Sequence, residues 1–182
     1  MRCFKIMDNI QYPQRWYLGN ILPEQDNWVF SSGRKIDIKA LPNDLKVEIY
    51  REGNSMDYTT TEGCLIPVIS STLKKALEFV QGIQFVPVKI KEDQYFIMVV
   101  YETIDCIDEG RSRFEKYAEG DTIRAELIGK YKAFLPMKID KGKVVGKDIF
   151  RPENYEVAII VSERIKEKIE IISPLTAKFV EV

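Results

Sequence analysis

The chain reads PVISSTLKKALE from Pro67 to Glu78 and reaches FVPV at Phe85–Val88. A second stretch follows the same pattern, because IIVSERIKEKIE runs from Ile159 to Glu170 and reaches FVEV at Phe179–Val182. In both, a short β-branched run ends in a serine, an amphipathic helix follows, and a further apolar run closes the unit. The sequence therefore predicts two similar strand–helix–strand units about ninety residues apart.

Each unit is centred on a helix with one apolar face. The apolar positions are Leu73, Ala76, Leu77 and Val80 in the first helix and Ile165, Ile169 and Ile172 in the second. Ser70 or Ser71 can cap the first helix and Ser162 the second, because a serine oxygen accepts a free backbone N–H. Gly82 suits the left-handed residue after the first helix, and Pro174 should stop the second.

The rest of the chain favours strands. Val, Ile, Tyr and Phe are enriched in the segments Arg2–Met7, Leu45–Tyr50, Ile83–Ile90, Tyr95–Ile104, Tyr131–Ile139, Tyr155–Val161 and Lys178–Val182. The first sixty residues are rich in turns and predict short strands and packed loops. Between Gly110 and Gly129 the pattern is ambiguous. Phe114 and Tyr117 could lie in a short helix, which Gly120 would break. We expect an α+β fold, with residues 1–182 forming a single domain built on one mixed or antiparallel sheet.

Composition restricts the class of protein. The 182 residues are 45% hydrophobic and 30% charged, with a formal net charge of −1, which is typical of a globular protein without an electrostatic bias towards nucleic acid. Three cysteines without CxxC spacing suggest neither a disulfide framework nor a zinc site. A cytoplasmic protein without a membrane span or cofactor is expected.

Familiar catalytic motifs are missing. The sequence has no histidine, so serine and cysteine triads and HExxH zinc sites are excluded. Ser71 and Lys74 have S-x-x-K spacing, but the companion motifs of serine acyl enzymes are absent. Gly142–Asp148 resembles a phosphate-binding loop with one residue too few between its glycines, so a turn is the simpler interpretation.

An acidic run lies between the two units. Glu102, Asp105, Asp108 and Glu109 give this run a local charge of −4. It could be a solvated strand end, a surface for a basic partner, or a hard-cation site in a metal-dependent hydrolase using Asp105, Asp108 and Glu109.

A basic segment, residues 130–151, follows the acidic run. Seven basic residues against Asp140 and Asp148 give it a local charge of +5, namely Lys130, Lys132, Lys138, Lys141, Lys143, Lys147 and Arg151. Lysines of this kind either protect edge strands from aggregation or contact phosphates in a nucleic-acid-binding module. In the turn-rich region, Trp16 and Trp28 are candidates for contacts with a protein partner, although such aromatics also build cores.

The order of several short pieces resembles a known bacterial family. The pieces are WYLG at Trp16–Gly19, DNWVFSSG at Asp26–Gly33, IDCID at Ile104–Asp108, IFR at Ile149–Arg151 and VSE at Val161–Glu163. Together they are similar to immunity family eleven of the polymorphic toxin systems, once catalogued as a domain of unknown function. The likeness extends from Phe4 to Val182.

The resemblance implies a protein that binds a cognate toxin domain and blocks its activity. It brings no catalytic motif, so a non-enzymatic protein is expected, acting through a protein–protein interface. Glu102, Asp105, Asp108, Glu109, Trp16 and Trp28 are the residues that we expect at this interface. A nucleic-acid-binding module and a metal-dependent hydrolase remain the alternatives.

Overall fold

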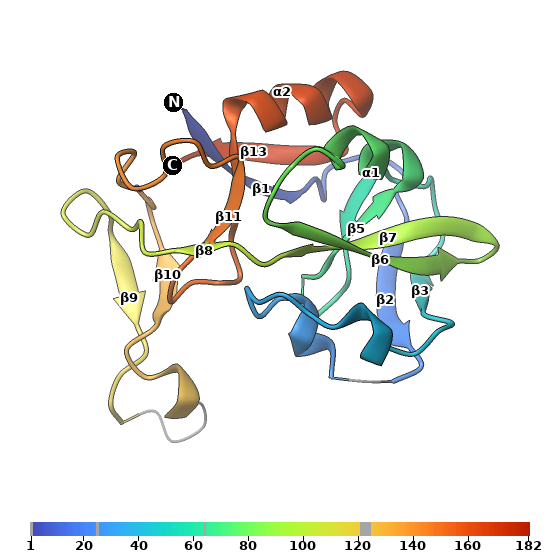
Figure 1. Ribbon diagram of the computed structural model, residues 1–182, viewed down its shortest axis with the longest axis horizontal. Helices are drawn as coiled ribbons and strands as arrows, with labels where there is room; N and C mark the ends of the chain where they lie inside the picture. The colour runs from blue at the N-terminus through green and yellow to red at the C-terminus, as the bar shows by residue number, and fades with distance from the viewer. Residues whose placement is uncertain (1, 25, 64, 121–124) are drawn as a thin grey trace.

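Two sheets of similar design organise the computed structural model, which describes residues 2–24, 26–63, 65–120 and 125–182 (Figure 1). The first unit comprises β4 (Tyr58–Thr60), β5 (Pro67–Ser70), α1 (Ser71–Leu77), β6 (Ile83–Ile90) and β7 (Asp93–Val100), with its strands in the order β6-β7-β5-β4. The second comprises β11 (Ile149–Pro152), β12 (Ile159–Ser162), α2 (Glu163–Ile172), β13 (Ala177–Glu181) and β1 (Cys3–Asp8), in the order β13-β1-β12-β11. Each strand of the first unit therefore has a counterpart at the same place in the second, so that β6, β7, β5 and β4 correspond to β13, β1, β12 and β11.

The two units also share their strand register. In each, the strand before the helix and the strand after it lie on either side of a central antiparallel strand, β7 or β1. In the first unit, Tyr95 on the central strand pairs with Ser70 on one side and Val88 on the other. In the second unit, Cys3 pairs in the same way with Ser162 and Val182. The repeat seen in the sequence is therefore also a structural repeat. The units differ in connectivity, because β6 leads directly into β7 whereas β13 and β1 lie at opposite ends of the chain.

Both helix caps have the same construction. Ser70 and Ser162 each accept a hydrogen bond from the backbone N–H three residues later, at 3.2 and 3.4 Å. Their hydroxyls in turn donate to Asp57 and Asp148, at 2.5 and 2.8 Å. The predicted caps are thus confirmed, with Ser70 rather than Ser71 in the first unit.

The predicted helix ends are only partly right. Helix α2 stops before Pro174, as expected. Helix α1 ends at Leu77, so Gly82 is not its left-handed terminal residue, although Gly82 does have a positive φ of 89°. A turn closed by the bond from Val80 N–H to the Leu77 carbonyl replaces the last expected turn.

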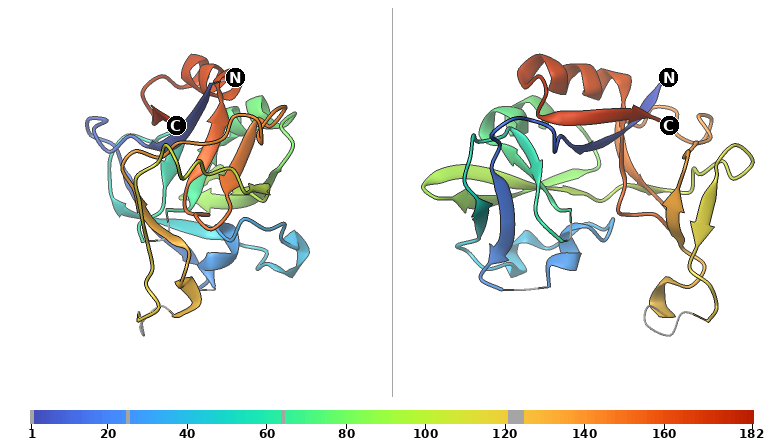
Figure 2. Two further views of the ribbon diagram at one scale, coloured as in Figure 1. Left: turned by 90° about the vertical axis from the view of Figure 1, so that its left-hand side faces the viewer. Right: turned by 180° about the vertical axis from the view of Figure 1, so that it is seen from behind.

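Further elements extend the two units. Strands β2 (Tyr17–Leu22) and β3 (Lys46–Arg51) join the first sheet, and a bridge between Leu18 and Thr61 brings its ends together so that it curls nearly into a barrel. Short 3-10 helices, η1 (Asn27–Phe30) and η2 (Ile38–Ala40), lie between β2 and β3. Strand β8 (Thr103–Ile104) pairs in parallel with β11. A separate ribbon of β9 (Phe114–Lys116) and β10 (Tyr131–Phe134), with η3 (Ala125–Leu127) between them, projects as an arm (Figure 2).

Buried apolar side chains of the described residues form three cores. One fills the curled first sheet, a second lies among both sheets and both helices, and a third lies beneath the arm. Successive side chains of a strand point to opposite faces of the sheet, so β12 contributes to two of these cores. Ile159 and Val161 enter the second core and Ile160 enters the third. Because the second core, called the central core here, takes side chains from both units, neither unit is independent of the other.

The expected α+β class and the mixed strand pairing agree with the structure, but the expectation of one sheet is wrong. Strands β9 and β11 were missed, β2 and β4 were covered only by the general expectation of short strands in the first sixty residues, and Phe114 lies in a strand instead of a helix. The segment Tyr95–Ile104 is broken into β7 and β8. In Tyr131–Ile139 the continuous strand ends at Phe134, because Pro136 lacks the N–H that a ladder needs, and Ile139 forms an isolated bridge with Ile107.

Two cysteines can be placed. Cys3 and Cys106 are free thiols buried in the third core, whereas Cys64 lies outside the described residues. Burial raises the pKa of the Cys106 thiol to about 12, so this group stays protonated near neutral pH.

Among the described residues, none of the helices is long and apolar enough to cross a membrane.

Candidate functional site

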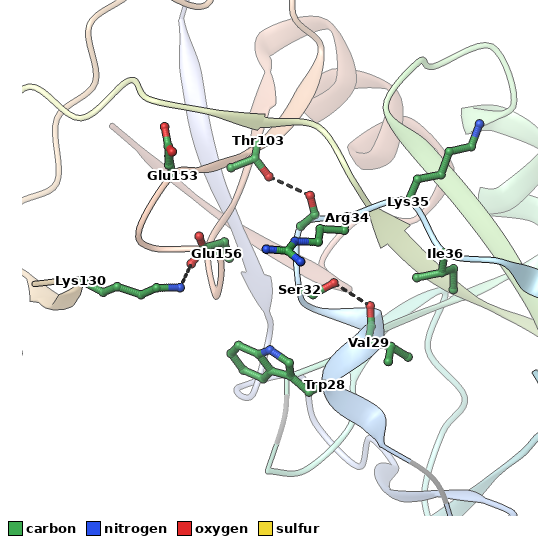
Figure 3. A pocket seen from close by; sticks show the side chains of 11 residues that line it. Trp28, Val29, Ser32, Arg34, Lys35, Ile36, Thr103, Lys130, Glu153 and Glu156 are labelled. Atoms are coloured by element: carbon green, nitrogen blue, oxygen red, sulfur yellow. Dashed lines mark hydrogen bonds and ion pairs between the residues drawn. The ribbon is translucent and has the colours of Figure 1, made fainter. Parts of the chain in front are cut away.

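A cleft of about 640 Å³ lies between the N-terminal 3-10 helices and the base of the arm (Figure 3). We call it the Trp28 cleft. It is lined by Trp28, Val29, Ser32, Gly33, Arg34, Lys35, Ile36, Thr103, Lys130, Glu153 and Glu156. These residues come from the turn-rich N-terminal third and from the segments between and next to the two repeats. Three distant parts of the chain therefore meet at one concave surface.

The wall that carries Trp28 is held in place by a short helix. Asp26 caps η1 by accepting the Trp28 N–H at 3.1 Å, and Phe30, the last residue of η1, is fully buried in the first core. Trp28 itself remains 46% exposed. A large aromatic side chain presented on an anchored element loses little entropy when a partner covers it.

Gly33 joins this wall to the second sheet. Its carbonyl accepts a hydrogen bond from the Thr103 hydroxyl at 2.9 Å, and its φ of 70° lies in the left-handed region that favours glycine. A Cβ atom here would lie only 2.6 Å from Thr103 Oγ1. The close approach of the two segments thus depends on glycine at this position.

The opposite wall combines charges of both signs. Lys130 pairs with Glu156 at 3.6 Å, while the exposed Glu153 near this wall and the exposed Arg34 on the Trp28 side have no ion pair to another described residue. Figure 3 shows Trp28 and Arg34 on one side of the cleft and Lys130 and Glu156 across from them. The free charges are available to a polar partner surface.

Arg151 is buried close to this wall. It is 1% exposed, donates to the carbonyls of Val100 and Glu156, and leaves Nη2 without a hydrogen-bond partner. Desolvation lowers the pKa of Arg151 to about 10, which still leaves the guanidinium charged near neutral pH. Arg151 cannot therefore contact nucleic-acid phosphates as a surface residue.

The acidic run is not a free anionic surface. Each carboxylate has a basic partner: Lys147 bonds to Glu102 at 2.6 Å, Lys143 to Asp105 at 3.1 Å, Arg111 to Asp108 at 2.5 Å and Lys116 to Glu109 at 2.7 Å. Asp105 remains the most exposed of the four, with 73% of its side chain accessible. Hydrogen bonds from Arg111 and Lys116 lower the pKa values of Asp108 and Glu109, so neither is a carboxylic acid held protonated for catalysis.

Ion pairs, two of them with the acidic run, also offset much of the charge of the basic segment. Lys130, Lys132, Lys143 and Lys147 each contact a carboxylate. The lysine surface that was predicted to contact phosphates is therefore largely paired with the protein's own carboxylates. Within the described ranges, no three His, Cys, Asp or Glu side chains gather closely enough to hold a metal ion, so the structure gives the hydrolase alternative no metal site.

Trp16 differs from Trp28. Its ring is 5% exposed in the first core and lies 5.4 Å from the Tyr95 ring, centroid to centroid. Trp16 is thus a core residue, and the expectation that it faces a partner does not fit its position. The cleft residues Arg34, Thr103 and Glu153 were missed by sequence reasoning, because no local pattern marks them.

Comparison with protein families gives a match over almost the whole chain. Residues 11–182 match the Immunity protein family (Imm11). A comparison with curated proteins found no match. The resemblance carried by the short pieces between Trp16 and Glu163 is thereby confirmed, and the chain belongs to the Immunity protein family (Imm11).

Proposed function

We propose that this protein binds a cognate toxin domain of a polymorphic toxin system and neutralises it by covering a surface that the toxin needs. The family match over residues 11–182 carries this proposal. The free core thiols of Cys3 and Cys106 agree with action in the cytoplasm, where cysteines stay reduced. Catalysis by the immunity protein is not required, because inhibition by occlusion needs only a stable complex.

The proposed interface is centred on the Trp28 cleft. A stable complex buries about 800 Å² on each partner, and exposed tryptophans are frequent among the residues that dominate binding energy. The cleft offers a half-exposed tryptophan together with Arg34 and Glu153, neither of which forms an ion pair with a described residue, within one concavity. The acidic run begins beside Thr103 in this wall, so Glu102 and Asp105 would border the same interface.

The function is tested with the toxin domain encoded next to the gene. Cells that express this toxin should survive when they also express the immunity protein, and the purified proteins should form a complex. Death of the cells and absence of a complex for every adjacent toxin candidate would overturn the proposal.

Removing the Trp28 side chain should weaken the complex by about tenfold to a hundredfold, since hot-spot aromatics contribute roughly 1.4–3 kcal/mol. Calorimetry on Trp28→Ala gives this value. Tyr50→Ala is the matched control, because Tyr50 is also an exposed aromatic residue but lies on β3, outside the cleft. Equal losses for the two variants would place the interface elsewhere.

Charge reversal tests the acidic run separately. If Asp105 and Asp108 face a basic toxin surface, changing both to lysine should slow association, and the effect should shrink as salt is added. The expected change is modest, because Lys143 and Arg111 already offset these carboxylates. Stopped-flow association measured at two salt concentrations provides the test. Unchanged rates with an intact fold would remove the run from the interface.

A further inference from the structure

A second concave surface lies where the two units meet, and it shares no lining residue with the Trp28 cleft. This groove has a volume of about 290 Å³ and is formed by β1, β4, the beginning of β5 and the turn before β12. Its exposed apolar side chains are Ile10, Leu65 and Val157, which are 70%, 59% and 52% accessible. Apolar side chains gathered around a groove are typical of a surface that another molecule covers.

Lys5 gives the groove an unmatched positive charge. The side chain lines the groove, and its Nζ lies 5.8 Å from the centroid of the Tyr155 ring. No described residue forms an ion pair or hydrogen bond with this ammonium group, and burial lowers the pKa of Lys5 without any opposing carboxylate. A partly desolvated cation without a counterion is costly, so a carboxylate brought to it would be stabilised.

The carboxylate already present in the groove is not available to Lys5. Asp8 holds Arg15 through two hydrogen bonds of 2.5 and 2.7 Å and also accepts the Thr60 hydroxyl at 3.2 Å. The other titratable groups in the groove, Tyr58 and Tyr155, are phenols whose pKa values are raised by burial, so they carry no charge near neutral pH. Among the described residues, the groove therefore presents apolar side chains together with the Lys5 ammonium group, which has no counterion.

We propose that this groove receives an apolar segment of the protein partner that carries an Asp or Glu side chain, with the carboxylate pairing with Lys5. The aliphatic side chains of that segment pack on Ile10, Leu65 and Val157, while the ion pair selects against neutral and basic segments. In taking the toxin as the partner, the inference rests on the proposed function. It adds the chemistry of the toxin segment that is recognised.

Two short peptides test the groove without the toxin. The probes are acetyl-Leu-Glu-Leu-amide and acetyl-Leu-Gln-Leu-amide, titrated into protein labelled at its Ile, Leu and Val methyl groups and followed by NMR. The glutamate peptide should shift the methyl signals of Ile10, Leu65 and Val157 and bind at least about fivefold more tightly than the glutamine peptide, because a partly buried ion pair is worth more than an exposed one.

Two variants show whether Lys5 makes the distinction. Lys5→Met keeps the length and apolar stem of the side chain, so both peptides should then bind equally weakly. Lys46→Met removes an exposed lysine on β3, outside the groove, and should leave the distinction intact. Equal binding of both peptides to the unmodified protein, shifts confined to other surfaces, or no binding at about 20 mM peptide, a range that still detects very weak complexes, would overturn the inference.

The toxin assay separates this inference from the proposed function. If the unmodified protein fails to rescue cells from any adjacent toxin, the proposed function fails, whatever the peptides do. If the unmodified protein rescues and Lys5→Met binds the toxin as tightly as Lys46→Met does, the groove is not part of the interface and the inference alone fails. Weaker toxin binding by Lys5→Met, with unchanged binding by Lys46→Met, is the expected result.

Discussion

Replacing Asp8 with alanine should destabilise the protein by about 3–5 kcal/mol, because it leaves the buried Arg15 guanidinium without its counterion. The Arg15 side chain is 2% exposed and that of Asp8 is 13% exposed. The two groups meet through a bidentate pair of hydrogen bonds, and Arg15 also donates to the Thr59 hydroxyl at 2.7 Å. Since Asp8 ends β1 and Thr59 lies in β4, the pair connects the two sheets.

Chemical denaturation measures this loss as a change in the free energy of unfolding. Glu52→Ala is the control, because Glu52 pairs with Lys91 at 2.8 Å but both side chains are mostly exposed. A double replacement, Asp8→Leu with Arg15→Met, should recover much of the loss, since exchange of a buried ion pair for apolar groups is often close to neutral. If Asp8→Ala costs no more than Glu52→Ala, the pair does not connect the sheets energetically.

The helices and the strands next to them could be predicted because their signals are local. Apolar residues three and four positions apart define one helix face, and a serine directly before this pattern defines the cap. Leu73, Leu77, Ile165 and Ile169 are all buried, as their spacing requires. The repeat reinforced these predictions, because the same pattern occurs twice with the same spacing.

The division into two sheets could not be predicted in the same way. Strands β4 and β8 have only three and two residues, too short for an alternating pattern to be recognised. Strand β4 pairs with the neighbouring β5, but the place of β8 depends on a partner distant in the chain, because β8 pairs with β11. Pairing over such distances is decided by tertiary packing, which local propensity does not report.

The candidate site was predictable only in part. Composition identified Trp28 as an aromatic residue in a turn-rich segment, but the same argument also selected Trp16, which the first core buries. The charges were counted correctly along the sequence, but the partners of the acidic run lie outside it, and two of them are far away, since Lys143 is 38 residues from Asp105 and Lys147 is 45 residues from Glu102. The net charge summed along a short stretch of sequence therefore overestimated the electrostatic potential at this surface.

Truncating the facing helices should produce the other large effect. Leu77 and Ile169 occupy equivalent positions in α1 and α2, are at most 1% exposed and belong to the central core. Leu77→Ala and Ile169→Ala should each lower the free energy of unfolding by about 2–5 kcal/mol, because each leaves a cavity that the packed surroundings cannot fill completely. Ile171→Ala is the control on the same helix and should have little effect, since Ile171 is 82% exposed.

The double variant tests whether the two units share one core in energy as well as in geometry. Helices α1 and α2 contact each other above the central core, so the cavities left at Leu77 and Ile169 open into the same packed region. The loss in the double variant should therefore differ from the sum of the single losses by at least about 0.5 kcal/mol, as is usual for coupled core positions. Strict additivity would mean that each helix stabilises its own sheet separately. A loss below about 0.5 kcal/mol for either single variant would show that its position is not part of a packed core, because buried leucine and isoleucine side chains cost more than this to remove.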